Sequence, residues 1–153
     1  MIVCPTDEPT LIVSSESQQN VELGGTVALF CEYKGNPKPR VMWYHINPIT
    51  DQVRNRPARE DDEMHLKIEN VTYHDEGHYY CEALNHNPIT NKEVIVRSSK
   101  IVVDIFGKPA IIQKKELNHG YRGTETDIEQ LFCSDPPPSL VYWTYGSLRI
   151  DVQ

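Results

Sequence analysis

The sequence contains no long apolar run. Its longest apolar segments, such as 101–103, have the length of a strand, whereas a membrane-spanning helix needs ~20 apolar residues. Basic residues are also few: 15 Lys and Arg stand against 22 Asp and Glu, which gives a net charge of −7. Because phosphate binding depends on clustered Lys and Arg, a nucleic-acid partner and an anionic membrane surface are both disfavoured.

Motifs of common enzymes and metal sites are missing as well. The six histidines form no HExxH pair, no serine lies in a Gly-x-Ser-x-Gly elbow, and no glycine-rich phosphate loop occurs. No two cysteines have the two-residue spacing of zinc or thioredoxin-like sites. We therefore expect a protein that is not an enzyme and that uses no metal, no cofactor and no small-molecule substrate.

The four cysteines stand at positions 4, 31, 81 and 133. The wide separation of Cys31 and Cys81 indicates a structural disulfide that closes a long loop, and therefore an oxidising compartment. The N-terminus lacks the basic region and the apolar stretch of a signal peptide. We therefore expect the chain to be a piece of a longer protein or to be already processed. Cys133 would then have lost its partner to truncation, while Cys4 is either a remnant of preceding sequence or an intermolecular thiol.

Strand signals dominate the pattern, and no window sustains a helical period. Alternating apolar residues with Gly and Pro between them predict an antiparallel sandwich of many short strands. The predicted strands cover 26–33, 41–43, 66–68, 77–83 and a long final strand at 93–106 that is bulged near 98–99. The predicted turns cover 23–25, 35–39, 71–76 and 85–88.

Cys31, Trp43 and Cys81 fall on inward-facing positions of three of these strands. In a two-sheet sandwich such cysteines bridge the sheets, and the indole packs on the disulfide. Tyr79 stands two residues before the second cysteine, where a tyrosine corner sends its hydroxyl back to upstream backbone. Gly77 permits a tight turn into this strand.

The segment DEGHYYC at 75–81 contains the residue types of a small active site. Strand alternation turns Tyr79 and Cys81 inward and His78 outward, so the segment indicates architecture rather than catalysis. Asp75 is then expected to pair with an arginine of the preceding polar segment. Arg56 and Arg59 are both candidates.

A family resemblance follows from the complete pattern. The residues that carry it are Leu23-Gly24-Gly25-x-Val27-x-Leu29-x-Cys31, then Trp43, then Leu66-x-Ile68-x-Asn70-Val71-x-x-x-Asp75-x-Gly77-x-Tyr79-x-Cys81. Over residues 9–106 this resembles the immunoglobulin superfamily, and most of all its I-set. The resemblance implies an all-β, immunoglobulin-like antiparallel β-sandwich with Leu29, Trp43 and Tyr79 in its core.

The pattern starts again after 106. Cys133 and Trp143 repeat Cys31 and Trp43 with ten rather than twelve residues between them, which predicts a tandem array. We expect an N-terminal extension at 1–8, an I-set domain at 9–106, and at 107–153 the first part of a second, truncated immunoglobulin-like domain with Trp143 in its core. Because no second cysteine follows, its inner face should be exposed or loosely packed. Glu129 stands where the first domain has an inward valine, so a bulge is needed to turn it outward.

Two possible sites lie in polar segments. Asn70-Val71-Thr72 is a glycosylation sequon in a turn that we expect to be exposed. The alternatives are a glycan on Asn70 and an unmodified polar turn. The acidic run at 60–63, with His65 nearby, lacks the spaced ligands and the glycine of an EF-hand. A solvated loop is therefore favoured there over a cation site.

A partner surface is expected on the outer side of the sheet that contains the predicted strands at 41–43, 77–83 and 93–106. Large amphipathic side chains there could anchor a partner, although ordinary cross-strand pairing on a solvated face explains the same residues. These residues are Met42, Tyr44, His78 and Tyr80. The segment 85–92 is a second candidate contact.

The resemblance implies a noncatalytic extracellular module of a cell-adhesion or cell-surface recognition protein, with a protein partner bound homophilically or heterophilically. The segment 133–149 is similar to invertebrate nephrin- or echinoid-like adhesion proteins, which implies a parent anchored in the plasma membrane. The alternatives are a secreted binding protein, such as a decoy or an immune-recognition protein, the ectodomain of a signalling receptor, and an accessory domain attached to an enzyme.

Overall fold

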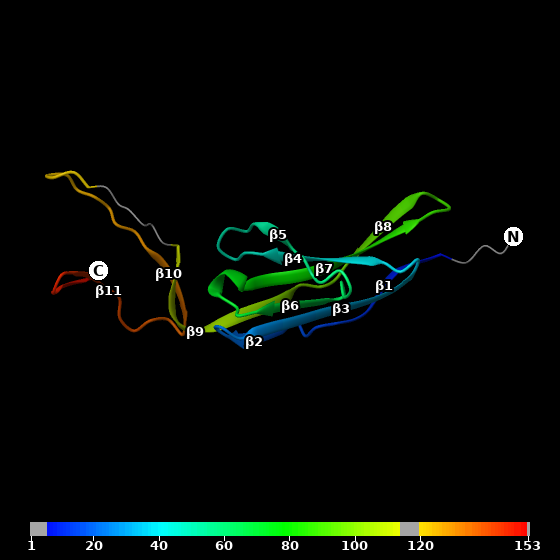
Figure 1. Ribbon diagram of the computed structural model, residues 1–153, viewed down its shortest axis with the longest axis horizontal. Helices are drawn as coiled ribbons and strands as arrows, with labels where there is room; N and C mark the ends of the chain where they lie inside the picture. The colour runs from blue at the N-terminus through cyan, green and yellow to red at the C-terminus, as the bar shows by residue number, and fades with distance from the viewer. Residues whose placement is uncertain (1–5, 114–119, 153) are drawn as a thin grey trace. The chain divides into compact units, whose positions relative to one another are not determined.

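The computed structural model describes residues 6–113 and 120–152, which form two compact units that divide between Ile105 and Phe106 (Figure 1). Antiparallel strand pairs dominate both units, as the sequence predicts. In the first unit the elements are β1 (Asp7–Ser14), β2 (Gln18–Glu22), β3 (Thr26–Asn36), β4 (Arg40–Ile46), β5 (Val53–Arg56), β6 (His65–Glu69), the 3-10 turn η1 (Tyr73–Asp75), β7 (Gly77–Asn87), β8 (Lys92–Arg97) and the beginning of β9 (Ile101–Gln113).

The first unit consists of two sheets. One has the strand order β1-β3-β6, and the other has the order β9-β7-β4-β5, with β2 joined to β9 and β8 joined to β7. Figure 1 shows β1, β3 and β6 in one layer and β5, β4 and β7 in the other. This is the predicted β-sandwich, since each strand has one face turned toward the opposite layer.

The core lies between the two layers and follows the alternation of the strands. In β3 every second side chain from Val27 to Tyr33 is buried, and in β4 the same holds from Val41 to His45. The most buried side chains come from both sheets and from the turn after β6. They are Trp43, Tyr79, Leu29, Ile101, Ile105, Val27, Val71, Val103, Cys31 and Cys81.

Two predicted boundaries are wrong. The turn predicted at 85–88 lies later, because β7 continues through Asn87 and pairs with β8 up to that residue. The single strand predicted at 93–106 is divided into β8 and β9 at 98–100. Here the Cys81 amide donates to the side-chain oxygen of Ser98 at 3.0 Å, so a hydroxyl takes the place of a backbone acceptor and the register shifts by one residue.

The described part of the second unit contains two strand pairs. The end of β9 pairs with β10 (Leu131–Asp135), and β11 (Tyr142–Tyr145) pairs with β12 (Leu148–Asp151). Cys133 lies in β10 and Trp143 lies in β11. Glu129 is exposed, so its charge is not in a core.

Candidate functional site

The framework of the first unit is a disulfide between β3 and β7. Cys31 and Cys81 are joined with a Cα–Cα distance of 6.6 Å, and both are fully buried. Trp43 lies opposite Cys81 in the pairing of β4 with β7 and is 1% exposed. Its indole N–H donates to the backbone oxygen of Glu63 at 3.0 Å, which ties the polar segment before β6 to the core. The sequence predicts the disulfide and the buried indole, but not the Glu63 contact.

A tyrosine corner holds the start of β7. The hydroxyl of Tyr79 donates to the backbone oxygen of Asp75 at 2.6 Å, and burial raises the pKa of this hydroxyl far above its ordinary value. The Asp75 carboxylate forms an ion pair with Arg56, one of the two arginines predicted for it. The other candidate, Arg59, pairs with Asp61 instead. These contacts join β5, η1 and β7.

His45 is a buried histidine that sequence reasoning missed. It is 2% exposed in β4, its ring stacks on Tyr79 with 4.5 Å between ring centroids, and its Nε2 donates to the backbone oxygen of Glu76 at 2.8 Å. Burial lowers the pKa of His45 below the ordinary value for histidine. The strict alternation with Val41 and Trp43 was a signal that this side chain points inward.

Gly77 lies where β7 passes β4. Its φ of +136° lies in the region that disfavours residues with a side chain, and an added Cβ would lie 2.3 Å from the backbone oxygen of Ile46. The predicted tight turn at Gly77 is therefore a close approach of two strands. A side chain at this position would push β4 and β7 apart.

The outer side of the β4–β7 pair contains a cluster of side chains around two tyrosines, which we call the Tyr44 face. Its residues are Met42, Tyr44, Tyr80, Glu82 and Arg97. Tyr44 and Tyr80 lie opposite each other in the strand register and stack with 5.1 Å between ring centroids. The hydroxyl of Tyr44 lies 4.0 Å from the sulfur of Met42. Tyr44 and Met42 are both half-buried, so each keeps surface for a partner.

Charged groups cover the rest of the Tyr44 face. The guanidinium of Arg97 lies 4.6 Å from the centre of the Tyr80 ring and donates to the Glu82 carboxylate at 2.8 Å from Nε. The Glu82 side chain is 12% exposed, whereas the Arg97 side chain is 61% exposed. Burial and the nearby Glu82 carboxylate raise the pKa of Tyr44. Arg97 comes from β8, the strand paired with β7, and no local sequence pattern indicates its contact with Tyr80.

The prediction that Tyr80 belongs to the exposed partner face needs a correction. Its ring is on the outer side, as alternation predicts, but it is only 7% exposed because Tyr44 and Arg97 cover it. His78 is exposed, and it lies two residues from Tyr80 along β7. The accessible aromatic group of the Tyr44 face is therefore Tyr44 itself.

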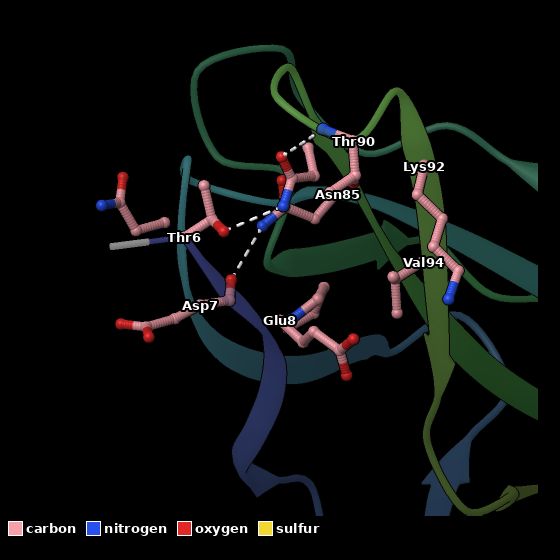
Figure 2. Close-up of a pocket in the computed structure, with 10 residues that line it drawn as sticks. Thr6, Asp7, Glu8, Asn85, Thr90, Lys92 and Val94 are labelled. Atoms are coloured by element: carbon pink, nitrogen blue, oxygen red, sulfur yellow. Dashed lines mark hydrogen bonds between the residues drawn. The ribbon is translucent and has the colours of Figure 1, made fainter. Parts of the chain in front are cut away.

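A cavity of about 270 Å³ lies between the beginning of β1 and the β7–β8 hairpin (Figure 2). Asn85 is buried beside it and donates from Nδ2 to the backbone oxygens of Asp7 at 3.1 Å and Pro37 at 2.9 Å. Figure 2 shows Glu8 of β1 and Val94 of β8 on its walls. The predicted second contact, 85–92, contributes Asn85, Asn87, Thr90 and Lys92 to the walls of the cavity. Both amide protons of Asn85 serve the fold.

Three of the four acidic residues at 60–63 contact basic groups. Arg59 contacts Asp61, His65 contacts Asp62, and Arg40 contacts Glu63. Within residues 6–113 and 120–152, no group of three or more His, Cys, Asp or Glu side chains is arranged to hold a metal ion.

Asn70 lies in the turn after β6, where its side chain is exposed and its φ is +53°. Thr72 of the same sequon is the N-cap of η1, and its amide donates to the Asp75 carboxylate at 3.0 Å. Asn70 is therefore open to solvent, on a turn that is held by its neighbours.

Trp143 is not in a core, which corrects a prediction made for the second unit. It is 40% exposed in β11, and every residue of β11 and β12 is exposed. In the described part of this unit, no facing sheet covers the hairpin. Trp143 instead lines an apolar cavity of about 570 Å³ with Ile111, Phe132 and Leu140. Cys133 is half-buried in β10, and Cys4 lies outside the described residues.

None of the described helical segments has the length and apolar character needed to cross a bilayer. The chain is similar to parts of several larger proteins. It is 30% identical over 136 residues to the human protein named probable oxidoreductase PXDNL, which covers 87% of this chain and 9% of that protein. Mouse Roundabout homolog 1 is 26% identical, with 95% of this chain and 9% of that protein covered.

The Caenorhabditis elegans protein named immunoglobulin domain-containing protein oig-1 is 34% identical over 82 residues, which are 50% of this chain and 60% of that protein. The chain thus spans less than two thirds of each of these relatives. A solved structure of the N-terminal four Ig domains of Dscam1 isoform 4.44 is similar with a TM-score of 0.51 and 18% identity, over 70% of this chain and 27% of that one. This last likeness shows the fold alone.

A family model described as the immunoglobulin domain matches residues 8–85, which is more than half of the chain. The match contains both bridged cysteines, Trp43 and the tyrosine corner. The similarity to nephrin- or echinoid-like proteins stays a prediction. The chain belongs to the immunoglobulin domain family.

Proposed function

We propose that this chain is an extracellular recognition module of a cell-surface adhesion protein and binds another protein, without catalysis, through the Tyr44 face. The observation that carries the proposal is the position of Tyr44, which is half-buried, stacked on Tyr80 and flanked by the ion pair of Arg97 with Glu82. Tyrosine and arginine are enriched among the residues that dominate protein interfaces. Because Tyr80 already restrains the Tyr44 ring, binding costs little additional conformational entropy.

Three observations support the location and the class of protein. The buried disulfide between Cys31 and Cys81 favours an oxidising, extracellular compartment. The relatives include proteins named Roundabout homolog 1 and limbic system-associated membrane protein. The match to the oxidoreductase covers only 9% of that protein, so it supports a shared domain rather than a shared activity. Anchoring of the parent protein in the plasma membrane belongs to the same proposal.

The domain organisation is also part of the proposal: residues 9–106 form an I-set domain, and 107–153 form the first part of a second immunoglobulin-like domain. Cys133 and Trp143 lie on β10 and β11, as Cys31 and Trp43 lie on β3 and β4. The apolar cavity beside Trp143 is what the inner face of half a sandwich would present.

The test uses beads coated with the full chain and a panel of cells that display extracellular proteins. Tyr44→Ala should reduce bead binding about tenfold or more, since a central interface tyrosine contributes at least 1.4 kcal/mol. Phe30→Ala is the matched control, because Phe30 is a half-buried aromatic residue in β3, a strand of the other sheet. Thermal unfolding of both variants checks that they are folded. Equal binding by the two variants would place the recognition surface elsewhere.

A further inference from the structure

Strand β8 has an open edge. Within residues 6–113 it is hydrogen-bonded to β7 alone, on one side. Figure 1 shows the β7–β8 hairpin projecting from the two layers of the sandwich. An open strand edge presents backbone N–H and C=O groups in the spacing that another strand requires.

The register identifies which backbone groups point to the open edge. Ser98 donates from its backbone N–H to the oxygen of Cys81 at 2.9 Å, so Ser98 faces β7. In an antiparallel pair every second residue faces the neighbour, so Val96, Val94 and Lys92 face β7 as well. The N–H and C=O groups of Glu93, Ile95 and Arg97 therefore point outward along the edge.

The side chains of the same three residues form a self-complementary row. Glu93, Ile95 and Arg97 all lie on the outer, exposed side of β8, and Ile95 is 58% exposed. If a second β8 is placed antiparallel with Ile95 opposite the partner's Ile95, Glu93 lies opposite the partner's Arg97. The reverse pair forms at the same time, so this register has two pairs of opposite charge around an apolar centre.

The other two-fold registers fit less well. A centre between Val94 and Ile95 would pair residues that face the edge with residues that face β7, and the backbone groups would not meet. A centre on Val94 would place Glu93 opposite the partner's Ile95 and leave Arg97 without a carboxylate across the edge. The pairing of opposite charges and the direction of the backbone N–H and C=O groups therefore favour the same register, which is centred on Ile95.

The inner side of β8 faces the beginning of β1. Val94 is half-buried and lines the cavity of about 270 Å³ between β8 and the beginning of β1 (Figure 2). In the register centred on Ile95, Val94 lies opposite the partner's Val96.

On the outer side, Arg97 can bind a second carboxylate, because a guanidinium has five N–H donors and only some of them donate to Glu82.

We propose that two copies of this chain associate through their β8 edges, with Ile95 on the two-fold axis, and form one continuous sheet across the dimer. The inference goes beyond the proposed function, because it assigns a second copy of the chain to a different surface, the β8 edge. The contact lies next to the Tyr44 face, since Arg97 takes part in both.

The test is sedimentation of the full chain over a range of concentrations, with two charge-reversal variants. Glu93→Arg and Arg97→Glu each create two pairs of like charge in the proposed register, so each variant alone should associate about tenfold or more weakly than the unaltered chain. An equimolar mixture of the two variants restores opposite charges at both positions. The mixture should therefore form a heterodimer. Association that persists in each variant alone, or a mixture that stays monomeric, would overturn the proposal.

A second pair of variants controls for general loss of apolar surface. Ile95→Asp places two carboxylates opposite each other at the two-fold axis and should abolish the dimer. Ile89→Asp removes a similarly exposed isoleucine, which is 65% exposed in the turn between β7 and β8, and should leave the dimer unchanged. Equal effects would overturn the proposal, as would a monomeric unaltered chain. Tyr44→Ala, tested both for cell binding and for self-association, separates the proposals. Unreduced cell binding with normal self-association would refute the Tyr44 face and leave the β8 contact standing, whereas reduced cell binding with normal self-association supports both.

Discussion

The hydroxyl of Tyr79 donates to the backbone oxygen of Asp75, four residues upstream, while the Asp75 side chain pairs with Arg56. One residue therefore anchors β7 through its backbone and β5 through its carboxylate. The Tyr44 face depends on this anchoring, because Tyr80 follows Tyr79 directly in β7.

Tyr79→Phe should lower the free energy of unfolding by about 1–2 kcal/mol, because a hydrogen bond is lost and the backbone oxygen of Asp75 is left without this donor. Equilibrium denaturation of the two proteins measures the difference. Tyr73→Phe serves as a comparison with another buried tyrosine outside the corner. An unchanged midpoint for Tyr79→Phe would show that the corner hydrogen bond does not stabilise the sandwich.

His45 should make stability depend on pH. Burial lowers its pKa in the folded chain, so the unfolded chain binds more protons once the pH falls below the unfolded value of about 6.5. The free energy of unfolding should therefore be highest above this value and should decrease as the pH falls toward 5. Burial is the main cause of the lowered pKa, and the guanidinium groups of Arg56 and Arg54 act in the same direction. Together they outweigh the Glu76 backbone oxygen and the Asp75 carboxylate, which raise the pKa of His45.

His45→Gln removes this titration and keeps a donor for the Glu76 oxygen. Its unfolding free energy should fall less steeply with acid, by up to about 1.4 kcal/mol per pH unit. Denaturation curves at several pH values provide the comparison. Identical slopes for the variant and the unaltered chain would mean that His45 is not the titrating group.

Gly77→Ala should destabilise the first unit by about 3 kcal/mol or more, because the new Cβ would collide with the backbone oxygen of Ile46 in a strained backbone conformation. Gly24→Ala is the matched control. Gly24 also has a positive φ, +84°, but the nearest atom to an added Cβ is the Asn70 side-chain oxygen at 3.8 Å. Its cost should be about 1 kcal/mol. Similar losses in the two variants would remove the close approach as the cause.

Asn70 should carry a glycan when the chain is secreted from eukaryotic cells, since its side chain is exposed in a turn. Asn70→Gly removes the acceptor and tolerates the φ of +53°, so it should lose the glycan without loss of stability. Intact mass before and after glycosidase treatment gives the answer. A glycosidase-insensitive mass for the unaltered chain would count against modification.

The residues that sequence reasoning placed correctly are those whose signal is local. Cys31, Trp43 and Tyr79 follow from period-two alternation and fixed spacing, and the β-sandwich follows from them. His45 follows the same alternation, but a polar residue at such a position does not by itself predict a buried side chain. The burial of Tyr80 was not predictable, because Arg97 reaches it from another strand.

The predicted ends of the strands were wrong for a similar reason. Asn85 is typical of a turn, yet its amide satisfies two distant backbone oxygens, and β7 therefore continues past it. Trp143 repeats the spacing of a core tryptophan, but burial depends on a second layer of strands, and in the described residues none covers it. Spacing along the chain predicts which residues face one side of a strand, and tertiary contacts decide what covers that side.

The most direct measurement is peptide mapping of the oxidised, unreduced protein by mass spectrometry. The fold predicts a linked pair of peptides that contain Cys31 and Cys81, and its disappearance on reduction. Cross-links that join either residue to Cys4 or Cys133 instead, or alkylation of both thiols in the folded protein, would contradict the sandwich on which the Tyr44 face and the β8 edge are built.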